Sequence, residues 1–133
     1  MEYGLSEHGD TVEERLAEFV EELAYDSIPD DALRTAERCY VDTLGVMIAG
    51  SLEQPAEVAQ RMIDSSGSAG GQATVIGQDI TASIGDATFV NGTAGHALDF
   101  DDVATDIGHS SVAIIPSALA VGEVFGTTGR DLL

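Results

Sequence analysis

Apolar residues recur at helical spacing in the first part of the chain. Between residues 11 and 25 they occupy positions 12, 16, 19, 20 and 23, and glutamates take the opposite side. This pattern predicts an amphipathic helix. Thr11 is followed three residues later by Glu14, which is the signature of a capping box. We therefore expect Thr11 to be the N-cap of this helix.

The rest of the chain is predicted to be helical apart from one short strand. The expected elements are a helix from Pro29 to Gly50, a helix from Pro55 to Ser65, a loop at 66–71, a strand at 73–77, a helix from Thr81 or Ser83 to Leu98, a helix ending at Phe125 and a turn of helix from Gly129. Gly50 suits the position after a helix, and Pro55 suits the first helical position. The pattern indicates an all-α fold with at most one short strand.

Glycine and proline interrupt two of these helical patterns. Gly85, Gly92 and Gly95 lie in the segment 81–98, and each costs roughly 1 kcal/mol of helix propensity relative to alanine. They indicate either the close approach of another helix or a break. Pro116 lies inside the last long apolar stretch, so that helix begins near Ser111 with a kink or begins near Ile115.

Composition adds a strong negative charge to this picture. The 133 residues include 24 acidic residues and five arginines but no lysine, which gives a net charge of −19. This charge excludes DNA, RNA and anionic membranes as partners. It is also typical of proteins from salt-accumulating cells, where high ionic strength screens the repulsion. Residues 1–10 are expected to form an acidic arm.

The apolar runs also bear on location and on redox chemistry. None reaches the ~20 residues that a membrane helix needs, and the N-terminus lacks the pattern of a signal peptide. We expect a cytoplasmic protein. The single cysteine, Cys39, excludes an intramolecular disulfide and is interpreted as a buried thiol.

The densest polar cluster runs from Asn91 to Asp102 and is followed by Asp106 and His109. It lies between two apolar helices, and histidine with aspartate offers proton transfer near neutral pH. A solvated acidic loop is the alternative interpretation. A calcium loop of the EF-hand type does not fit, because Val103 and Ala104 replace a ligand and the required glycine.

A second alternative for this cluster is a magnesium site. The run 101–106 matches the DDxxxD pattern of prenyl-diphosphate enzymes, in which carboxylates hold Mg²⁺ against a diphosphate. The basic residues that would help to hold the diphosphate are missing nearby, and the sequence has no second aspartate-rich motif. We therefore expect no metal site here.

Five stretches of the sequence resemble the MmgE/PrpD family, which includes 2-methylcitrate dehydratases and cis-aconitate decarboxylases. The most specific is Asn-Gly-Thr-Ala-Gly-His-Ala-Leu-Asp-Phe-Asp-Asp, and the resemblance covers about residue 32 to the end. The stretches are 40–46, 73–77, 89–102, 109–123 and 129–133. The resemblance implies a large helical domain with a smaller α/β lid, a homodimer, no metal or organic cofactor, and loss of water or CO₂ from a small tricarboxylate. Residues 11–133 would then be an incomplete N-terminal part of the helical domain, without the lid.

The resemblance also assigns the site residues. Asp99 and His109 map to catalytic positions, and either could be the acid or the base. Four further residues are expected to bind substrate or to order the loop: Asn91, His96, Asp101 and Asp102. Two positions depart from the family pattern, since Ser110 replaces a proline that follows the histidine and Val103 replaces a threonine.

The function favoured at this point is dehydration of 2-methylcitrate, with a non-catalytic helical remnant or interaction module as the alternative. No lysine or arginine lies between Arg61 and Arg130. A tricarboxylate needs cations in its binding site. We therefore expect the isolated chain to be inactive. The helical stretch from Val112 to Phe125 is too apolar to stand exposed, so we also expect the isolated chain to self-associate.

Overall fold

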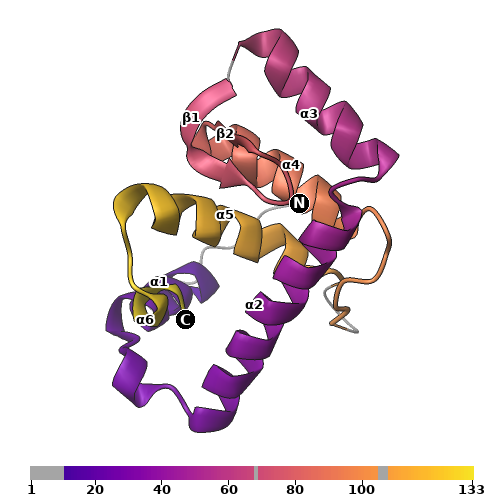
Figure 1. Cartoon of the computed structure of the whole chain (residues 1–133). Coiled ribbons are helices and arrows are strands. Elements are labelled where there is room, and N and C mark those ends of the chain that lie inside the picture. The colour runs from indigo at the N-terminus through magenta and orange to yellow at the C-terminus, as the bar shows by residue number, and fades with distance from the viewer. Residues whose placement is uncertain (1–10, 68, 105–107) are drawn as a thin grey trace, which may run out of the picture.

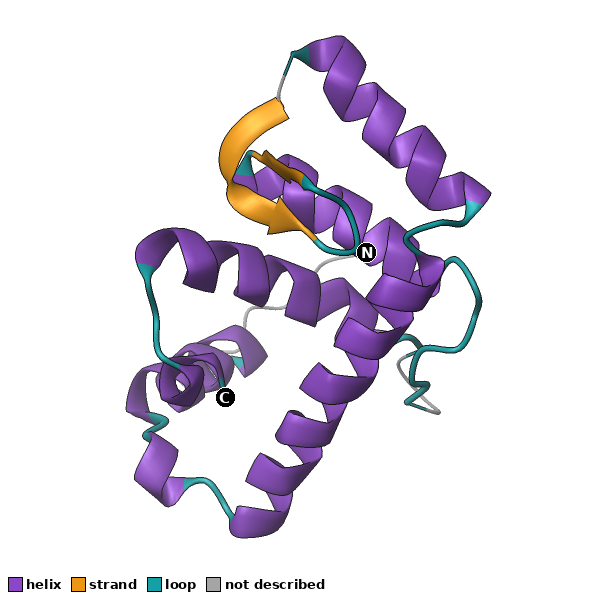
Figure 2. Ribbon diagram, viewed as in Figure 1, coloured by secondary structure: helices purple, strands orange, loops and turns teal. Residues whose placement is uncertain are grey.

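The computed structural model describes residues 11–67, 69–104 and 108–133, so the acidic arm predicted for residues 1–10 lies outside the described residues. The described residues are mainly helical, as predicted, with one small antiparallel sheet (Figures 1 and 2). The elements are α1 (Val12–Glu22), the 3₁₀ helix η1 (Tyr25–Ser27), α2 (Asp30–Gly50), α3 (Gln54–Ser66), β1 (Ala69–Val75), β2 (Ile80–Ala82), α4 (Ile84–His96), α5 (Ser110–Phe125) and α6 (Gly129–Leu132).

Helix α4 lies at the centre of the fold. It packs against α2, α3, α5 and both strands, and Figure 1 shows the hairpin lying against it. The core is built from small and medium side chains: Ala59, Ile63, Ala73, Val75, Ala82, Ala87, Val90 and Ala120. Short side chains let these elements approach closely.

Across the described part of the chain, no helix is both long and apolar enough to cross a membrane.

Glycines allow α4 to contact two of its neighbouring helices, α2 and α5, closely. A Cβ atom on Gly50 of α2 would lie 2.0 Å from the carbonyl oxygen of Ala94, and one on Gly95 would lie 2.6 Å from Cγ2 of Val112 in α5. For the glycines of residues 81–98, the predicted close approach of another helix is therefore confirmed at Gly95. Gly50 is the last residue of α2 rather than the residue after it, so the prediction of its position was wrong; its role is this contact.

Several predicted helix ends are confirmed and others are wrong, including the end of α4, which lies at His96 rather than Leu98. The backbone N–H of Glu14 donates to Oγ1 of Thr11 at 3.2 Å, and the N–H of Thr11 donates to Oε2 of Glu14 at 2.8 Å, which completes the capping box. Helix α1 ends at Glu22 rather than Tyr25, because the backbone at Leu23 is extended. Helix α5 takes the earlier of its two predicted starts and contains Pro116.

The hairpin corrects the prediction of a loop at 66–71. Strand β1 begins at Ala69 and pairs with β2 in a register that places Thr74 opposite Thr81. A Cβ atom on Gly71 would lie 2.1 Å from the backbone of Ala82. Glycine is therefore required there by the close crossing of the strands, not by flexibility. Strand β2 was not predicted, because three residues are too few to show an alternating pattern.

Candidate active site

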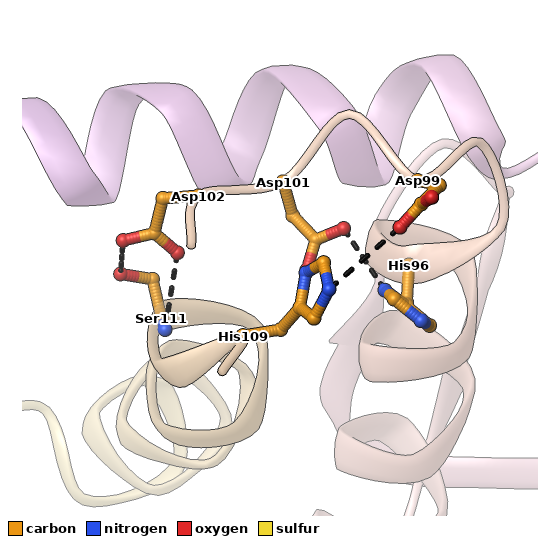
Figure 3. Close-up of polar contacts among 6 residues, drawn as sticks. All are labelled: His96, Asp99, Asp101, Asp102, His109 and Ser111. Carbon is orange, nitrogen blue, oxygen red and sulfur yellow. Dashed lines mark hydrogen bonds and ion pairs between the residues drawn. The ribbon is translucent and has the colours of Figure 1, made fainter. Parts of the chain in front are cut away.

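The predicted polar cluster lies on the loop that joins α4 to α5. His96 is the last residue of α4, and His109 is the N-cap residue of α5. Because α4 packs directly against α5, the two ends of the loop are held close together. Figure 3 shows both imidazoles turned toward the carboxylate of Asp101 between them. Asp106 lies outside the described residues.

Asp101 is the centre of this cluster. Its side chain is only 1% exposed, and its two carboxylate oxygens lie 2.9 Å from Nδ1 of His96 and 2.9 Å from Nδ1 of His109. The two rings meet edge to face, with centroids 4.5 Å apart. Burial raises the pKa of Asp101, but hydrogen bonds and the charges of both histidines outweigh it and leave the pKa below its usual value. Asp101 is therefore ionised near neutral pH.

Asp99 lies on the other side of His109 and has an unusual backbone. Its Oδ1 is 3.7 Å from Nε2 of His109, and its side chain is 79% exposed. Its φ of 54° is the only positive value among the described non-glycine residues. Left-handed backbone at a non-glycine residue costs about 1–3 kcal/mol and occurs preferentially at functional sites. His109 therefore has a carboxylate facing each ring nitrogen.

Asp102 connects the loop to the start of α5 by two hydrogen bonds. Its Oδ1 accepts the backbone N–H of Ser111 at 3.3 Å, and its Oδ2 accepts the hydroxyl of Ser111 at 2.6 Å. A carboxylate here satisfies an unpaired N–H at the positive end of the helix. Ser110 occupies the first helical position, which also suits the proline of the family pattern. The thiol of Cys39 lies 3.9 Å from Oδ2 of Asp102 and is half-buried rather than fully buried.

Asn91 is held by the hairpin. Its side chain is almost fully buried, its Nδ2 donates to the carbonyl of Thr74 at 3.0 Å, and its Oδ1 accepts the N–H of Ile76 at 2.8 Å. Both polar atoms of the amide are thereby bonded to the β1 segment, by which we mean β1 and the next residue, Ile76. We assign Asn91 to the attachment of β1 to α4. The sequence alone could not indicate this, because the contacts depend on the packing of the hairpin.

The cluster also contains a set of possible metal ligands. Among the described residues, His96, Asp99, Asp101 and His109 each offer an atom within 4.8 Å of the others. Imidazole and carboxylate together are a donor set that Zn²⁺ accepts. The Nδ1 atoms of both rings are in contact with Asp101, however, so a metal bound through these atoms would replace both contacts. Asp102, which the sequence offered as a magnesium ligand, is bonded to α5.

An open groove of about 460 Å³ lies beside the cluster. Its wall is formed by α4, the start of α5 and Pro55 of α3, and His96 is the only titratable residue among the described residues that line it. The groove gives a small molecule access to one of the two imidazoles. None of these described lining residues is a lysine or arginine that would neutralise an anionic ligand.

Comparison with known proteins assigns a family to this arrangement. The MmgE/PrpD N-terminal domain matches residues 14–133. Cis-aconitate decarboxylase from Homo sapiens is 30% identical over 128 residues, and cis-aconitate decarboxylase from Mus musculus is 32% identical over 130 residues; each match covers 92% of this chain. The chain spans only 26% of the length of either relative. No solved structure matches significantly. The family match and the helical fold together show that this chain belongs to the MmgE/PrpD family of lyases.

Proposed function

We propose that this chain supplies the His109–Asp99 pair for proton transfer in a lyase that acts on a small tricarboxylate. The observation that supports the proposal is the position of His109, with Asp101 at Nδ1 and Asp99 3.7 Å from Nε2. Dehydration needs a base near a carbon-bound proton and an acid near the leaving hydroxyl. Decarboxylation needs a proton delivered to the carbanion that the loss of CO₂ leaves. A histidine beside a carboxylate can serve either reaction.

The proposed substrate class is the small tricarboxylates, and two members of this class are the first to test. The two relatives described above are named for cis-aconitate decarboxylation, so cis-aconitate is the first substrate to test. Dehydration of 2-methylcitrate, which the sequence motifs favoured, is the second. Both molecules carry three carboxylates, and both reactions remove a small group from a carbon close to a carboxylate.

The charge of the site indicates that the active enzyme requires more than these residues. Within the described part of the chain, the ion pairs of the cluster are made by histidines, without lysine or arginine. A tricarboxylate would be repelled by Asp99 and Asp101 unless cations neutralised it. We propose that these cations come from regions that the relatives possess beyond the aligned quarter. The isolated chain is therefore expected to be inactive.

A chimera tests the proposal. In it, these 133 residues replace the matching segment of the human relative, and turnover of cis-aconitate and 2-methylcitrate is measured by NMR. Asp99→Asn and His109→Gln should each lower kcat by about 10² or more, as the loss of a general acid or base does. Asp26→Asn is the control, because it breaks only an exposed ion pair with Arg130. Near-normal turnover in both site variants, with circular dichroism showing folded protein, would refute the assignment.

A further inference from the structure

We propose that Asp101 is a positioning residue for two imidazoles: it holds both His96 and His109 in the tautomer with hydrogen on Nδ1, and so leaves both Nε2 atoms as bases. The inference rests on the proposed function for the reaction that these atoms would serve. It adds His96 to the site as a second base and gives the buried carboxylate a chemical role beyond ordering the loop.

The hydrogen-bond chemistry of Asp101 supports the tautomer. An ionised carboxylate only accepts hydrogen bonds. Each of its oxygens lies 2.9 Å from Nδ1 of one ring, which is a hydrogen-bond distance. Both contacts can form together only if each Nδ1 carries a hydrogen. A protonated Asp101 would donate to one ring and reverse its tautomer, but an ordinary aspartate is ionised near neutral pH.

Burial makes this arrangement rigid. The side chain of Asp101 is 1% exposed, so its oxygens cannot exchange the two histidines for water without moving the loop. The two rings belong to different helices, because His96 ends α4 and His109 precedes α5. One carboxylate therefore orients both rings and joins the two helices.

The two Nε2 atoms have different surroundings. Nε2 of His109 faces the exposed carboxylate of Asp99 at 3.7 Å. Nε2 of His96 points away from Asp101 in Figure 3, on a side chain that is 52% exposed and forms part of the groove wall. In its neutral form it can accept a hydrogen bond from a substrate in the groove. In its protonated form it can donate one to a substrate carboxylate.

NMR of the chain with ¹⁵N-labelled histidine tests the tautomers directly, without substrate. The two-bond ¹H–¹⁵N couplings are recorded above the pH range in which imidazoles titrate, and the same chain in urea is the reference. We expect His96 and His109 to carry hydrogen on Nδ1 in the folded chain and to lose that preference in urea. Hydrogen on Nε2 in either ring of the folded chain would overturn the proposal. This wild-type result decides the question even where a variant fails to fold.

Variants show whether Asp101 is the cause. Asp101→Asn offers one acceptor and one donor, so one ring should change to the Nε2–H tautomer. Asp102→Asn is the matched control, because Asp102 bonds Ser111 instead of a histidine, and both rings should keep hydrogen on Nδ1. A folded Asp101→Asn chain with an unchanged tautomer spectrum would refute the role of Asp101. Because no turnover is involved, an inactive chimera would count against the proposed function and leave this result unaffected.

Discussion

Replacing Asn91 should detach the β1 segment from α4. The amide of Asn91 is bonded on one side to the carbonyl of Thr74 and on the other to the N–H of Ile76, at 3.0 and 2.8 Å. The side chain thus provides β1 with the hydrogen bonds that a neighbouring strand would otherwise provide. Asn91→Ala removes both bonds and leaves two backbone groups in a partly buried environment without these partners.

The size of the effect follows from these two bonds. An unsatisfied buried polar group costs about 1–3 kcal/mol, and both groups here are only partly buried. We therefore expect Asn91→Ala to lower the free energy of unfolding by about 2–4 kcal/mol, a large part of the 5–15 kcal/mol typical of a domain. Asn91→Asp keeps the bond to Ile76 but places a second acceptor against the carbonyl of Thr74. It should be at least as destabilising at neutral pH and recover relative to Asn91→Ala when acid protonates the new carboxyl.

Urea unfolding followed by circular dichroism in molar KCl measures both variants. Thr93→Ala is the control on the same helix, because it removes only a hydroxyl bond to the carbonyl of Phe89. Its effect should stay within about 0.5 kcal/mol. If Asn91→Ala cost no more than Thr93→Ala, or if the Asp variant showed no relative recovery in acid, the attachment of β1 by this amide would be wrong.

Three further predictions concern packing, pH and salt. Gly50→Ala should lower the free energy of unfolding in urea by about 1–3 kcal/mol, because its Cβ would overlap Ala94. Gly45→Ala in the same helix is the control: its Cβ would meet open space, so the change should be neutral or stabilising. Equal effects of the two variants would refute the close contact of α2 with α4. Because the pKa of Asp101 is lowered in the folded chain, its ionised form stabilises the fold above the normal carboxyl range near pH ~4, and this contribution is lost as pH falls through the lowered value. The free energy of unfolding should therefore fall less steeply with acid in Asp101→Asn than in the wild type. The same pH dependence in both proteins would contradict the shift. Molar KCl should raise Tm by screening a net charge of −19, and a Tm independent of KCl would remove the interpretation of salt adaptation.

The helices were predictable because their signals are local. Thr11 with Glu14 fixes the start of α1, and the apolar periodicity of 30–50 is long enough to identify α2. Strand β2 has only three residues, and Gly71 looks like part of a flexible loop until its partner strand is known. Such contacts depend on residues distant in sequence, and periodicity carries no information about them.

The same limit applies to the cluster. Its residues were identified from their types and from the family motif, but the sequence could not assign partners to neighbouring carboxylates. Asp101 bonds two histidines, while Asp102 bonds Ser111 at the start of α5. Adjacent residues on this loop point in different directions, so their division of roles depends on the conformation of the loop. The left-handed backbone of Asp99 is likewise visible only in the structure.

The short sequence separations within the cluster have a consequence for folding kinetics. Asp101 contacts histidines five residues before it and eight residues after it. Closing a loop of about ten residues takes roughly 10–100 ns, and its entropic cost rises only with the logarithm of length. The His–Asp cluster can therefore form as soon as α4 meets α5, before more distant segments dock. In a longer protein the proposed proton-transfer groups would thus be in place early, and the cations proposed for substrate binding would arrive later.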